Sequence, residues 1–454
     1  MKTICKIAIV VLAGLHLIKA VATINATMAI FVVSIVVLLS GLVIMSKGFK
    51  KATIVFLAIG TAMLFQSSQP LSVWILAVNA MTNIIAVLVI MQTFSIPIKM
   101  GEYNIAIGYW LHKYFKKEGT LFLFTTISTH IFTSFLMFGS IPLMFSLMEN
   151  TLKGHVGDYK RFMATAISRG FAFASLWAPG AITVLLMVQT VGVTWSEIFV
   201  PGIILSIIGF VISYLIEMKF NLSVNTKYNE IDNKVLYSEK CDQGRAFHII
   251  WVVLSLILFN IILEKLHIGS SSNRITLAVA IVVLLWTLQF IKNPNLKTTL
   301  RNYWKNDVLK TADLAPFFIA MGIFFIGLEH SSFIGVIQFS LQNFTNTWGL
   351  LSIVIIPLLI IVCSIFGIHP FITIVLFGKI FTLLQLPITP VTIALCLALG
   401  GTISYMVSPF AGIIMIIAKF LDARTVDVAI HWNWLFSLIY FWVGIIFAYF
   451  WGQF

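Results

Sequence analysis

The chain has 454 residues, of which 60% are hydrophobic and only 10% are charged. A soluble domain is about 45–50% apolar and about a quarter charged, so this composition excludes a soluble globular fold. Disordered chains are poor in aromatic residues, whereas 14% of this chain is aromatic. The sequence therefore predicts an all-α polytopic membrane protein embedded in the lipid bilayer. The net charge of +13 is spread over separate loops, which indicates membrane orientation rather than a nucleic-acid partner.

Apolar stretches of about 20 residues predict about eleven transmembrane helices. In chain order they cover residues 5–22, 27–46, 52–67, 72–96, 158–191, 198–218, 246–264, 272–291, 312–333, 389–419 and 429–452. Two further apolar segments, 119–150 and 349–384, are too long for one helix and too interrupted for two ordinary spans. Residues 1–22 resemble a signal peptide, but His16 and Lys19 interrupt the apolar run. This interruption favours a retained first helix over cleavage.

The basic residues predict the side on which each loop lies. They flank both ends of 119–150, so this segment is expected to be a re-entrant hairpin that opens to the cytoplasm. Residues 334–348 and 384–390 contain no Lys or Arg, which predicts that the hairpin 349–384 opens to the outside. The N-terminus is then cytoplasmic and the C-terminus outside, in the cell membrane. Five of the 29 Lys and Arg residues fall elsewhere than the cytoplasmic side, namely Lys19, Lys265, Arg274, Arg169 and Lys379.

Two proline-containing motifs recur at nearly the same spacing. Phe138-Gly139-Ser140-Ile141-Pro142 returns 228 positions later as Phe366-Gly367-Ile368-His369-Pro370. Gly170 and Pro179 return 230 positions later as Gly400 and Pro409. The two copies have opposite charge flanks, so we expect two inverted-topology repeats, each with a re-entrant hairpin and a broken helix. Such repeats are typical of secondary transporters.

These features give a predicted domain organisation. Residues 1–50 form N-terminal helices, and 51–218 form the first repeat, with hairpin 119–150 and broken helix 158–191. A cytoplasmic linker, 219–245, leads to the second repeat. That repeat covers 246–454, with hairpin 349–384 and broken helix 389–419.

Proline is tolerated at the first position of a helix and breaks a helix further along. Pro142 and Pro370 are therefore expected to begin the second arms of the hairpins, and Pro179 and Pro409 the second halves of the broken spans. Each break exposes amide donors suited to an anion and carbonyl oxygens suited to Na⁺. The alternative is that these prolines only kink packed helices.

Three ionisable residues stand out inside predicted membrane segments. His369 could donate to an anionic substrate, carry a proton, or remain a neutral histidine in the turn. Arg169 could neutralise a substrate, pin the first hairpin or extend to the interface, and no acidic partner for it is evident in its span. His130 is expected to be packed and hydrogen-bonded. The other candidate substrate or ion contacts are Gly139, Ser140, Pro142, Ser175, Pro179, Gly367, Pro370, Thr373, Ser408 and Pro409.

Over residues 50–454 this pattern resembles the ion transporter superfamily, especially divalent anion/sodium symporters and arsenite-permease-like transporters. The shared features are a cytosolic amphipathic helix, a hairpin and a broken span, followed by the same set inverted. The Ser-Asn-Thr triplets of the hairpin tips in dicarboxylate carriers are absent, and Ser140 and His369 are the polar groups here. The resemblance implies an elevator-type motion of hairpins and broken helices against a homodimeric scaffold.

The predicted function is secondary active transport of a small anion, such as an organic acid, coupled to Na⁺ or H⁺. No Asp or Glu lies near the breaks, which favours an anionic or neutral substrate. We expect no catalytic residue, no resident metal and no cofactor apart from Na⁺ as a coupling ion. Two alternatives remain: a membrane enzyme acting on a lipid-linked substrate, and a passive channel.

Overall fold

The computed structural model describes residues 1–22, 24–101, 103, 117–152, 156–222, 244–332, 335, 349–384 and 386–452. Within these ranges the regular structure is helical and there is no β-strand. Most of the predicted cytosolic amphipathic helix, residues 101–117, and most of the predicted linker 219–245 lie outside the described residues. The chain forms two compact units, 1–101 with 251–346 and 102–250 with 347–454. Each unit therefore takes segments from both predicted repeats.

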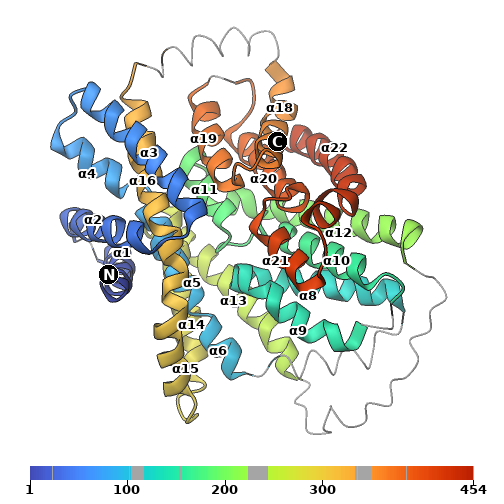
Figure 1. The fold of residues 1–454 in the computed structure, drawn as a ribbon. Helices are drawn as coiled ribbons and strands as arrows, with labels where there is room; N and C mark the ends of the chain where they lie inside the picture. The colour runs from blue at the N-terminus through green and yellow to red at the C-terminus, as the bar shows by residue number, and fades with distance from the viewer. Residues whose placement is uncertain are drawn as a thin grey trace. The chain divides into compact units, whose positions relative to one another are not determined.

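Unit 1 contains most of the N-terminal helices (Figure 1). Its elements are α1 (Lys2–Val21), α2 (Thr27–Ile44), α3 (Lys47–Gln66), α4 (Leu71–Asn79), α5 (Thr82–Gln92), α6 (Ser95–Met100), α14 (Ser271–Leu288), α15 (Leu296–Asn302), the π-helix η2 (Tyr303–Asp307), the 3₁₀ helix η3 (Val308–Asp313) and α16 (Ala315–Glu329). Helix α16 packs against α2, α3 and α4. Helix α13 (Gly244–Lys265) crosses the boundary between the units.

Unit 2 contains the elements on which the predicted site residues lie. They are α8 (Glu118–Leu136), the 3₁₀ turn η1 (Met137–Gly139), α9 (Ser140–Leu152), α10 (Tyr159–Ala174), α11 (Ile182–Val191), α12 (Trp195–Phe220), η4 (Gly349–Leu351), α18 (Ser352–Ile365), α19 (Pro370–Leu383), α20 (Pro390–Val407), α21 (Gly412–Leu421), the π-helix η5 (Asp427–His431) and α22 (Trp434–Trp451).

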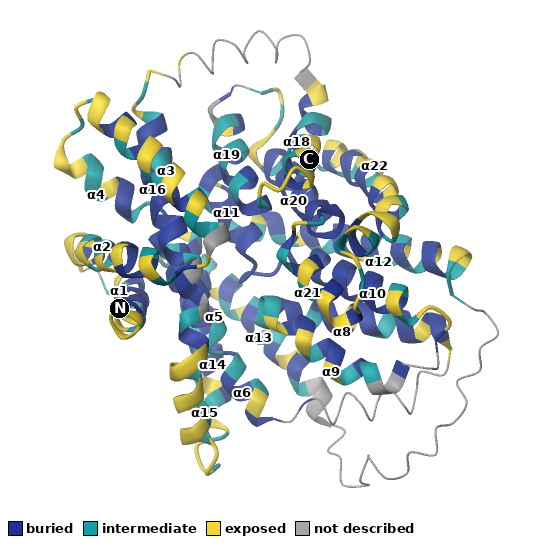
Figure 2. Ribbon diagram, in the orientation of Figure 1, coloured by how far each residue is buried: buried dark blue, intermediate teal, exposed yellow. Residues whose placement is uncertain are grey.

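The helices have the length and composition of membrane spans. Nine described helical segments could cross a bilayer, and each overlaps one of the eleven predicted spans. The remaining two ranges, 158–191 and 312–333, hold shorter helices, among them the 15-residue α16. Helices α2, α3 and α22 contain many exposed apolar residues, whereas α11 and α20 are almost wholly buried (Figure 2). The protein is therefore a polytopic membrane protein.

The segments predicted as hairpins each form two helices joined by a short tip. The first hairpin is α8, η1 and α9, and the second is α18, residues 366–369 and α19. In both cases the first arm packs on the first half of a broken span: α8 on α10, and α18 on α20. The second arms pack across, α9 on α21 and α19 on α11, while α10 contacts α20. These contacts place both tips and both breaks inside unit 2.

Candidate functional site

The two helix breaks have the same backbone structure. The Ala181 amide donates to the Ala178 carbonyl oxygen at 2.9 Å, and the Ala411 amide donates to the Ser408 carbonyl oxygen at 3.0 Å. Each bond closes a four-residue turn that ends one residue before the next helix begins. The residues ahead of α11 and α21 also have matching dihedrals, with φ −68° and ψ 128° at Ala181 and φ −64° and ψ 132° at Ala411.

This geometry corrects the predicted role of two prolines. Pro179 and Pro409 do not begin the second half-helices, because α11 starts at Ile182 and α21 at Gly412. They occupy the second position of the turns, where the fixed φ of proline suits a β-turn. At the hairpins, Pro370 is the first residue of α19, as predicted, whereas α9 begins two residues before Pro142.

Two glycines allow the hairpins to approach the broken helices. A Cβ atom at Gly170 would collide with the Thr126 carbonyl oxygen on α8. A Cβ atom at Gly400 would lie 2.8 Å from Cα and 3.0 Å from the carbonyl oxygen of Pro357 on α18. Real Cβ atoms do not approach backbone atoms closer than 3.0 Å, so glycine alone fits at Gly170 and at Gly400. The recurrence of Gly170 as Gly400 in the sequence thus corresponds to one contact made in both halves.

The tip of the first hairpin satisfies its own polar groups. The Ser140 hydroxyl is fully buried, lies 2.8 Å from the Thr133 hydroxyl and donates to the Met137 carbonyl oxygen at 2.8 Å. Gly139 and Pro142 are exposed beside it. The Ser140 side chain therefore links the tip to both arms of the hairpin.

The tip of the second hairpin is more exposed. Phe366 is 81% exposed, and Gly367 has the left-handed φ of 90° that closes the turn. Nδ1 of His369 accepts from the Phe371 amide at 3.2 Å and so caps the start of α19. The Thr373 hydroxyl donates to the Pro370 carbonyl oxygen at 3.0 Å and is buried. His369 therefore has at least a structural role at the helix start.

A buried cluster around Tyr405 joins the breaks and the tips. The Tyr405 hydroxyl lies 3.1 Å from the Thr183 hydroxyl of α11, and the ring packs against Phe171 at 5.8 Å and Phe371 at 6.1 Å between centroids. Phe138 of the first tip packs in turn on Phe171 at 5.5 Å. This cluster therefore brings together α10, α11, α19, α20 and the first tip. No sequence motif pointed to Tyr405, Phe171 or Phe371.

A second link joins the two broken spans directly. The hydroxyls of Ser175 and Thr402 lie 3.1 Å apart, and both are buried. Ser175 also donates to the Ala172 carbonyl oxygen at 2.6 Å. Thr402 and Tyr405 lie seven and four residues before Pro409 in the sequence, within two helical turns of the break. This spacing was the sequence signal that could have placed both residues at the second break.

Two buried hydroxyls at the second break have unused hydrogen-bonding capacity. Ser408 donates its hydroxyl to the Ser364 carbonyl oxygen at 2.6 Å and accepts from the Phe410 amide at 3.3 Å. The hydroxyl oxygens of Ser364 and Ser404 are buried and have no hydrogen-bond partner. Ser364 lies at the end of α18 and Ser404 in the last turn of α20, so two helix C-termini meet there.

The first break is apolar at the matching positions. The 228- and 230-residue offsets relate Ser364 to Leu136, Ser404 to Ala174, and Ser408 to Ala178. Residues 176–181 are all buried, whereas Phe410 in the second break is 58% exposed. The two breaks therefore share a backbone but differ in chemistry and in access.

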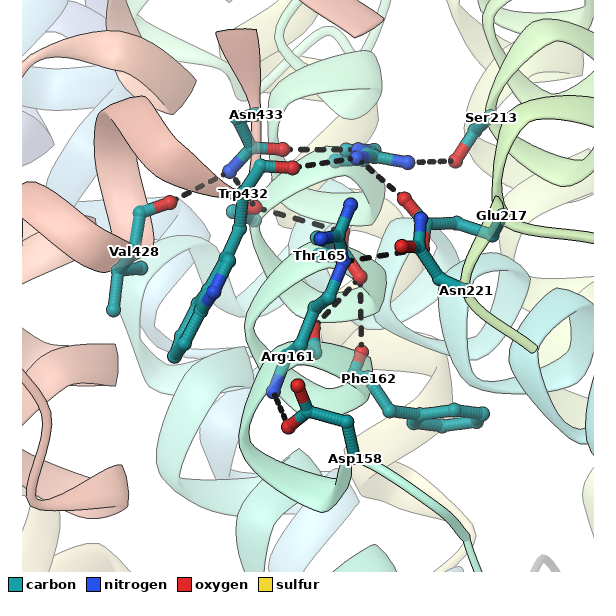
Figure 3. Close-up of polar contacts among 12 residues, drawn as sticks. Asp158, Arg161, Phe162, Thr165, Ser213, Glu217, Asn221, Val428, Trp432 and Asn433 are labelled. Atoms are coloured by element: carbon teal, nitrogen blue, oxygen red, sulfur yellow. Dashed lines mark hydrogen bonds and ion pairs between the residues drawn. The ribbon is translucent and has the colours of Figure 1, made fainter. Parts of the chain in front are cut away.

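The structure provides the partner that the sequence did not reveal for Arg169. Its Nη2 atom lies 2.9 Å from Oε1 of Glu217 on α12, and both side chains are buried. Arg169 also donates from Nε to Oδ1 of Asn433 at 2.9 Å, from Nη1 to Ser213 at 3.1 Å and from Nη2 to the Trp432 carbonyl oxygen at 3.1 Å (Figure 3). Of the three roles considered for Arg169, extension to the membrane interface does not fit, because the side chain is fully buried and paired.

Other contacts hold this ion pair in place. Asn221 donates to Oε2 of Glu217 at 2.8 Å, and Nε of Arg161 lies 3.7 Å from the same oxygen (Figure 3). The guanidinium of Arg169 lies 4.6 Å from the centre of the Phe436 ring. The network joins α10, α12 and the junction of η5 with α22. It links these elements within unit 2.

His130 is packed, as predicted. Its Nε2 atom accepts from Nε1 of Trp177 at 3.1 Å, and its ring lies 5.1 Å from that of Phe210. Both Trp177 and the nearby Trp195 lie against the first break, and Nε1 of Trp195 donates to the Trp177 carbonyl oxygen at 2.9 Å. These contacts fill the space around the first break with aromatic side chains.

Two solved structures resemble the whole fold. The YdaH transporter of Alcanivorax borkumensis superposes with a TM-score of 0.58 at 12% sequence identity, over 88% of this chain and 98% of that one. The fold is one that membrane transporters use. MtrF of Neisseria gonorrhoeae, which belongs to a class of antimetabolite efflux pumps, superposes with a TM-score of 0.50 at 13% identity, over 80% of this chain and 79% of that one. No protein-family model and no curated protein sequence matches the chain.

Proposed function

We propose that this protein is a secondary active transporter that moves a small organic anion across the cell membrane together with Na⁺. The observation that carries the proposal is the second break, where two unpartnered buried hydroxyls meet two helix C-termini. The transporter fold of YdaH and MtrF supports the general class.

The chemistry at the second break favours a cation without a carboxylate. The last carbonyl groups of a helix have no partner within it and carry a partial negative charge. The ends of α18 and α20 bring two such poles to the hydroxyls of Ser364 and Ser404. Hydroxyl and carbonyl oxygens are hard ligands, which suit Na⁺. Coupling to H⁺ is less favoured, because Glu217, a buried carboxylate of unit 2, is already paired with Arg169.

The starts of the second half-helices favour an anion. Neither Ala181 nor Ala411 supplies a side-chain cap to α11 or α21, so the first amides of both helices keep their donor capacity. No Asp or Glu lies in either break. The rings of Phe138, Phe171 and Phe371 would contact the apolar part of an organic anion, such as a carboxylate. A bound cation at the end of α20 and an anion at the start of α21 would attract each other.

The crossed packing of unit 2 supports two inverted-topology repeats. In the first hairpin the second arm, α9, packs on α21, which belongs to the second broken span. In the second hairpin the second arm, α19, packs in the same way on α11, which belongs to the first broken span. The first arms also correspond, because α8 packs on α10 and α18 packs on α20. A pseudo-two-fold relation of this kind is typical of secondary transporters. We further propose that the protein forms a homodimer and moves its substrate by an elevator-type motion, as its resemblance to the ion transporter superfamily implies.

Na⁺-dependent stabilisation tests the coupling site without knowledge of the substrate. A ligand at 100 times its Kd stabilises the folded state by about 2.7 kcal/mol. The melting temperature of the purified protein should therefore rise with NaCl relative to choline chloride, and the rise should be lost in S404A and S364A. Ser146 is an exposed hydroxyl on α9, so S146A is the matched control. Equal stabilisation of the native protein, S404A, S364A and S146A by NaCl would refute the assignment of Na⁺ to the second break.

Transport itself is tested in proteoliposomes with a panel of small carboxylates. Uptake should saturate with substrate and collapse when the Na⁺ gradient is dissipated. Flux that does not saturate and ignores the gradient would indicate a passive channel. Turnover of a lipid-linked substrate without transport would indicate the enzyme. Reversing the Na⁺ gradient shows the direction of movement, which decides between uptake and export.

A further inference from the structure

A short basic segment at the ends of several spans has the features of a lipid-binding site. The segment is Leu296–Asp307, formed by α15 and η2 in unit 1. Lys297, Arg301 and Lys305 follow each other at four-residue steps and are all exposed. On a helix this spacing places three cations along one face. We propose that this face binds the headgroups of anionic phospholipids.

The opposite face of the segment is fixed to the rest of unit 1. Thr299 donates to Sδ of Met100 at 3.2 Å, and the Tyr303 hydroxyl donates to the Val89 carbonyl oxygen at 3.1 Å. Asp307 pairs with Lys99 at 3.1 Å. Thr299, Tyr303 and Asp307 are also four residues apart, so the inward stripe lies about 200° from the basic stripe. The cations therefore point away from the core because the inward stripe is fixed.

The first helix of the protein holds the other end of the segment. Nζ of Lys6 donates to the carbonyl oxygens of Trp304 at 3.0 Å and Lys305 at 2.6 Å. The positive charge of Lys6 on these carbonyl groups stabilises the π-helix η2 and keeps Lys305 in place. Burial first, and then the Asp307 charge, raises the pKa of Tyr303, so its hydroxyl stays protonated and continues to donate to Val89.

The position and composition of the face identify the kind of partner. One candidate span begins at Lys2, and two others end at Met100 and Leu288. The helices with these ends contact the segment or precede it directly in the chain. The segment thus lies at an edge of the membrane. Leu300 and Trp304 are each 43% exposed and form an apolar stripe beside the basic one. Cations beside Trp and Leu at this depth suit a membrane interface.

Charge complementarity selects an anionic lipid. Residues 289–306 contain no Asp or Glu, and Lys292 is also exposed. Asp307, the carboxylate that follows, is buried and paired with Lys99. The outward face therefore carries cations and no carboxylate. Each Lys or Arg near an anionic leaflet contributes about 1 kcal/mol, which is roughly fivefold in affinity.

Native mass spectrometry of the full chain in detergent tests this proposal. Phosphatidylglycerol and phosphatidylcholine with the same acyl chains are the two probes. Phosphatidylglycerol should bind more tightly, and the variant K297Q/R301Q/K305Q should weaken it on the order of 100-fold, with phosphatidylcholine unchanged. The variant should fold as the native protein does, because the three side chains are exposed. An unchanged melting temperature checks this point.

A second charge variant separates a site from a general effect. Lys50, Lys51 and Lys419 lie elsewhere in the chain, so K50Q/K51Q/K419Q removes the same charge without touching the segment. This variant should keep the native preference for phosphatidylglycerol. Equal weakening by both variants, or no lipid preference in the native protein, would overturn the proposal. Loss of the preference in 0.5 M NaCl would support it, since headgroup attraction is screened.

Discussion

The buried pair Arg169–Glu217 allows a sharp test of how unit 2 is held together. In E217L the carboxylate is removed while the guanidinium stays fully buried. Removing one partner of a buried pair typically destabilises by about 3–5 kcal/mol, because an uncompensated charge remains. Arg161, whose Nε atom lies 3.7 Å from the Glu217 carboxylate, would then add repulsion instead of attraction. We expect E217L at the upper end of this range.

The reverse variant, R169M, leaves a different set of groups unpaired. Oδ1 of Asn433 and the Trp432 carbonyl oxygen lose their donor, at about 1–3 kcal/mol for each acceptor left buried and unsatisfied. Glu217 keeps the amide of Asn221 at 2.8 Å and the partly exposed Arg161. The double variant R169M/E217L removes both charges. It should be less destabilised than the sum of the two single variants by about 1–3 kcal/mol.

Thermal unfolding of the purified protein, followed by intrinsic fluorescence in one detergent, measures these differences. For a unit of this size 3–5 kcal/mol corresponds to a shift on the order of 10 °C. R161Q is the control, because a pair at 3.7 Å with one partly exposed partner contributes less than about 1 kcal/mol. Additive single and double variants, or E217L as stable as R161Q, would refute the account of Arg169 as a buried structural link.

Three further predictions concern the breaks and tips. G170A and G400A should each destabilise the protein by about 1–3 kcal/mol, because the added methyl group overpacks against Thr126 and Pro357. G14A is the control, since no atom lies within 4 Å of its added Cβ, and melting curves measure the difference. H369A should lower the melting temperature through the lost cap, and H369N should restore it; transport by H369N then reports on the ring itself. Y405F removes the hydroxyl that contacts Thr183 of α11 and should destabilise the protein by about 0.5–1.5 kcal/mol, the usual contribution of one hydrogen bond; an unchanged melting temperature would exclude this link between α11 and α20.

The sequence was informative about the elements and less so about their contacts. Apolar length located nine spans, and the recurring Gly and Pro residues located both breaks, because proline fixes φ and removes an amide donor whereas glycine allows close packing. The helix start at Pro179 was placed three residues too early, since a proline signals an end to helical hydrogen bonding but does not distinguish a turn from a helix start.

Contacts between distant segments could not be predicted from one sequence. Glu217 is 48 residues from Arg169 and belongs to another helix, so no local pattern connects them. The Tyr405 cluster gathers rings from four elements for the same reason. The difference between the breaks was visible in the sequence as Ser404 against Ala174, but its meaning depended on the shared backbone geometry.

The central claim is that Na⁺ binds at the second break and drives the movement of an organic anion. The most direct measurement is ²²Na⁺ uptake into proteoliposomes with and without the carboxylate panel, for native protein, S404A and S146A. We predict that at least one carboxylate stimulates Na⁺ uptake by native protein and S146A, and that S404A loses this stimulation. Substrate-stimulated Na⁺ uptake that is equal in S404A and native protein would contradict the assignment, and carboxylate transport without any Na⁺ flux would contradict the coupling.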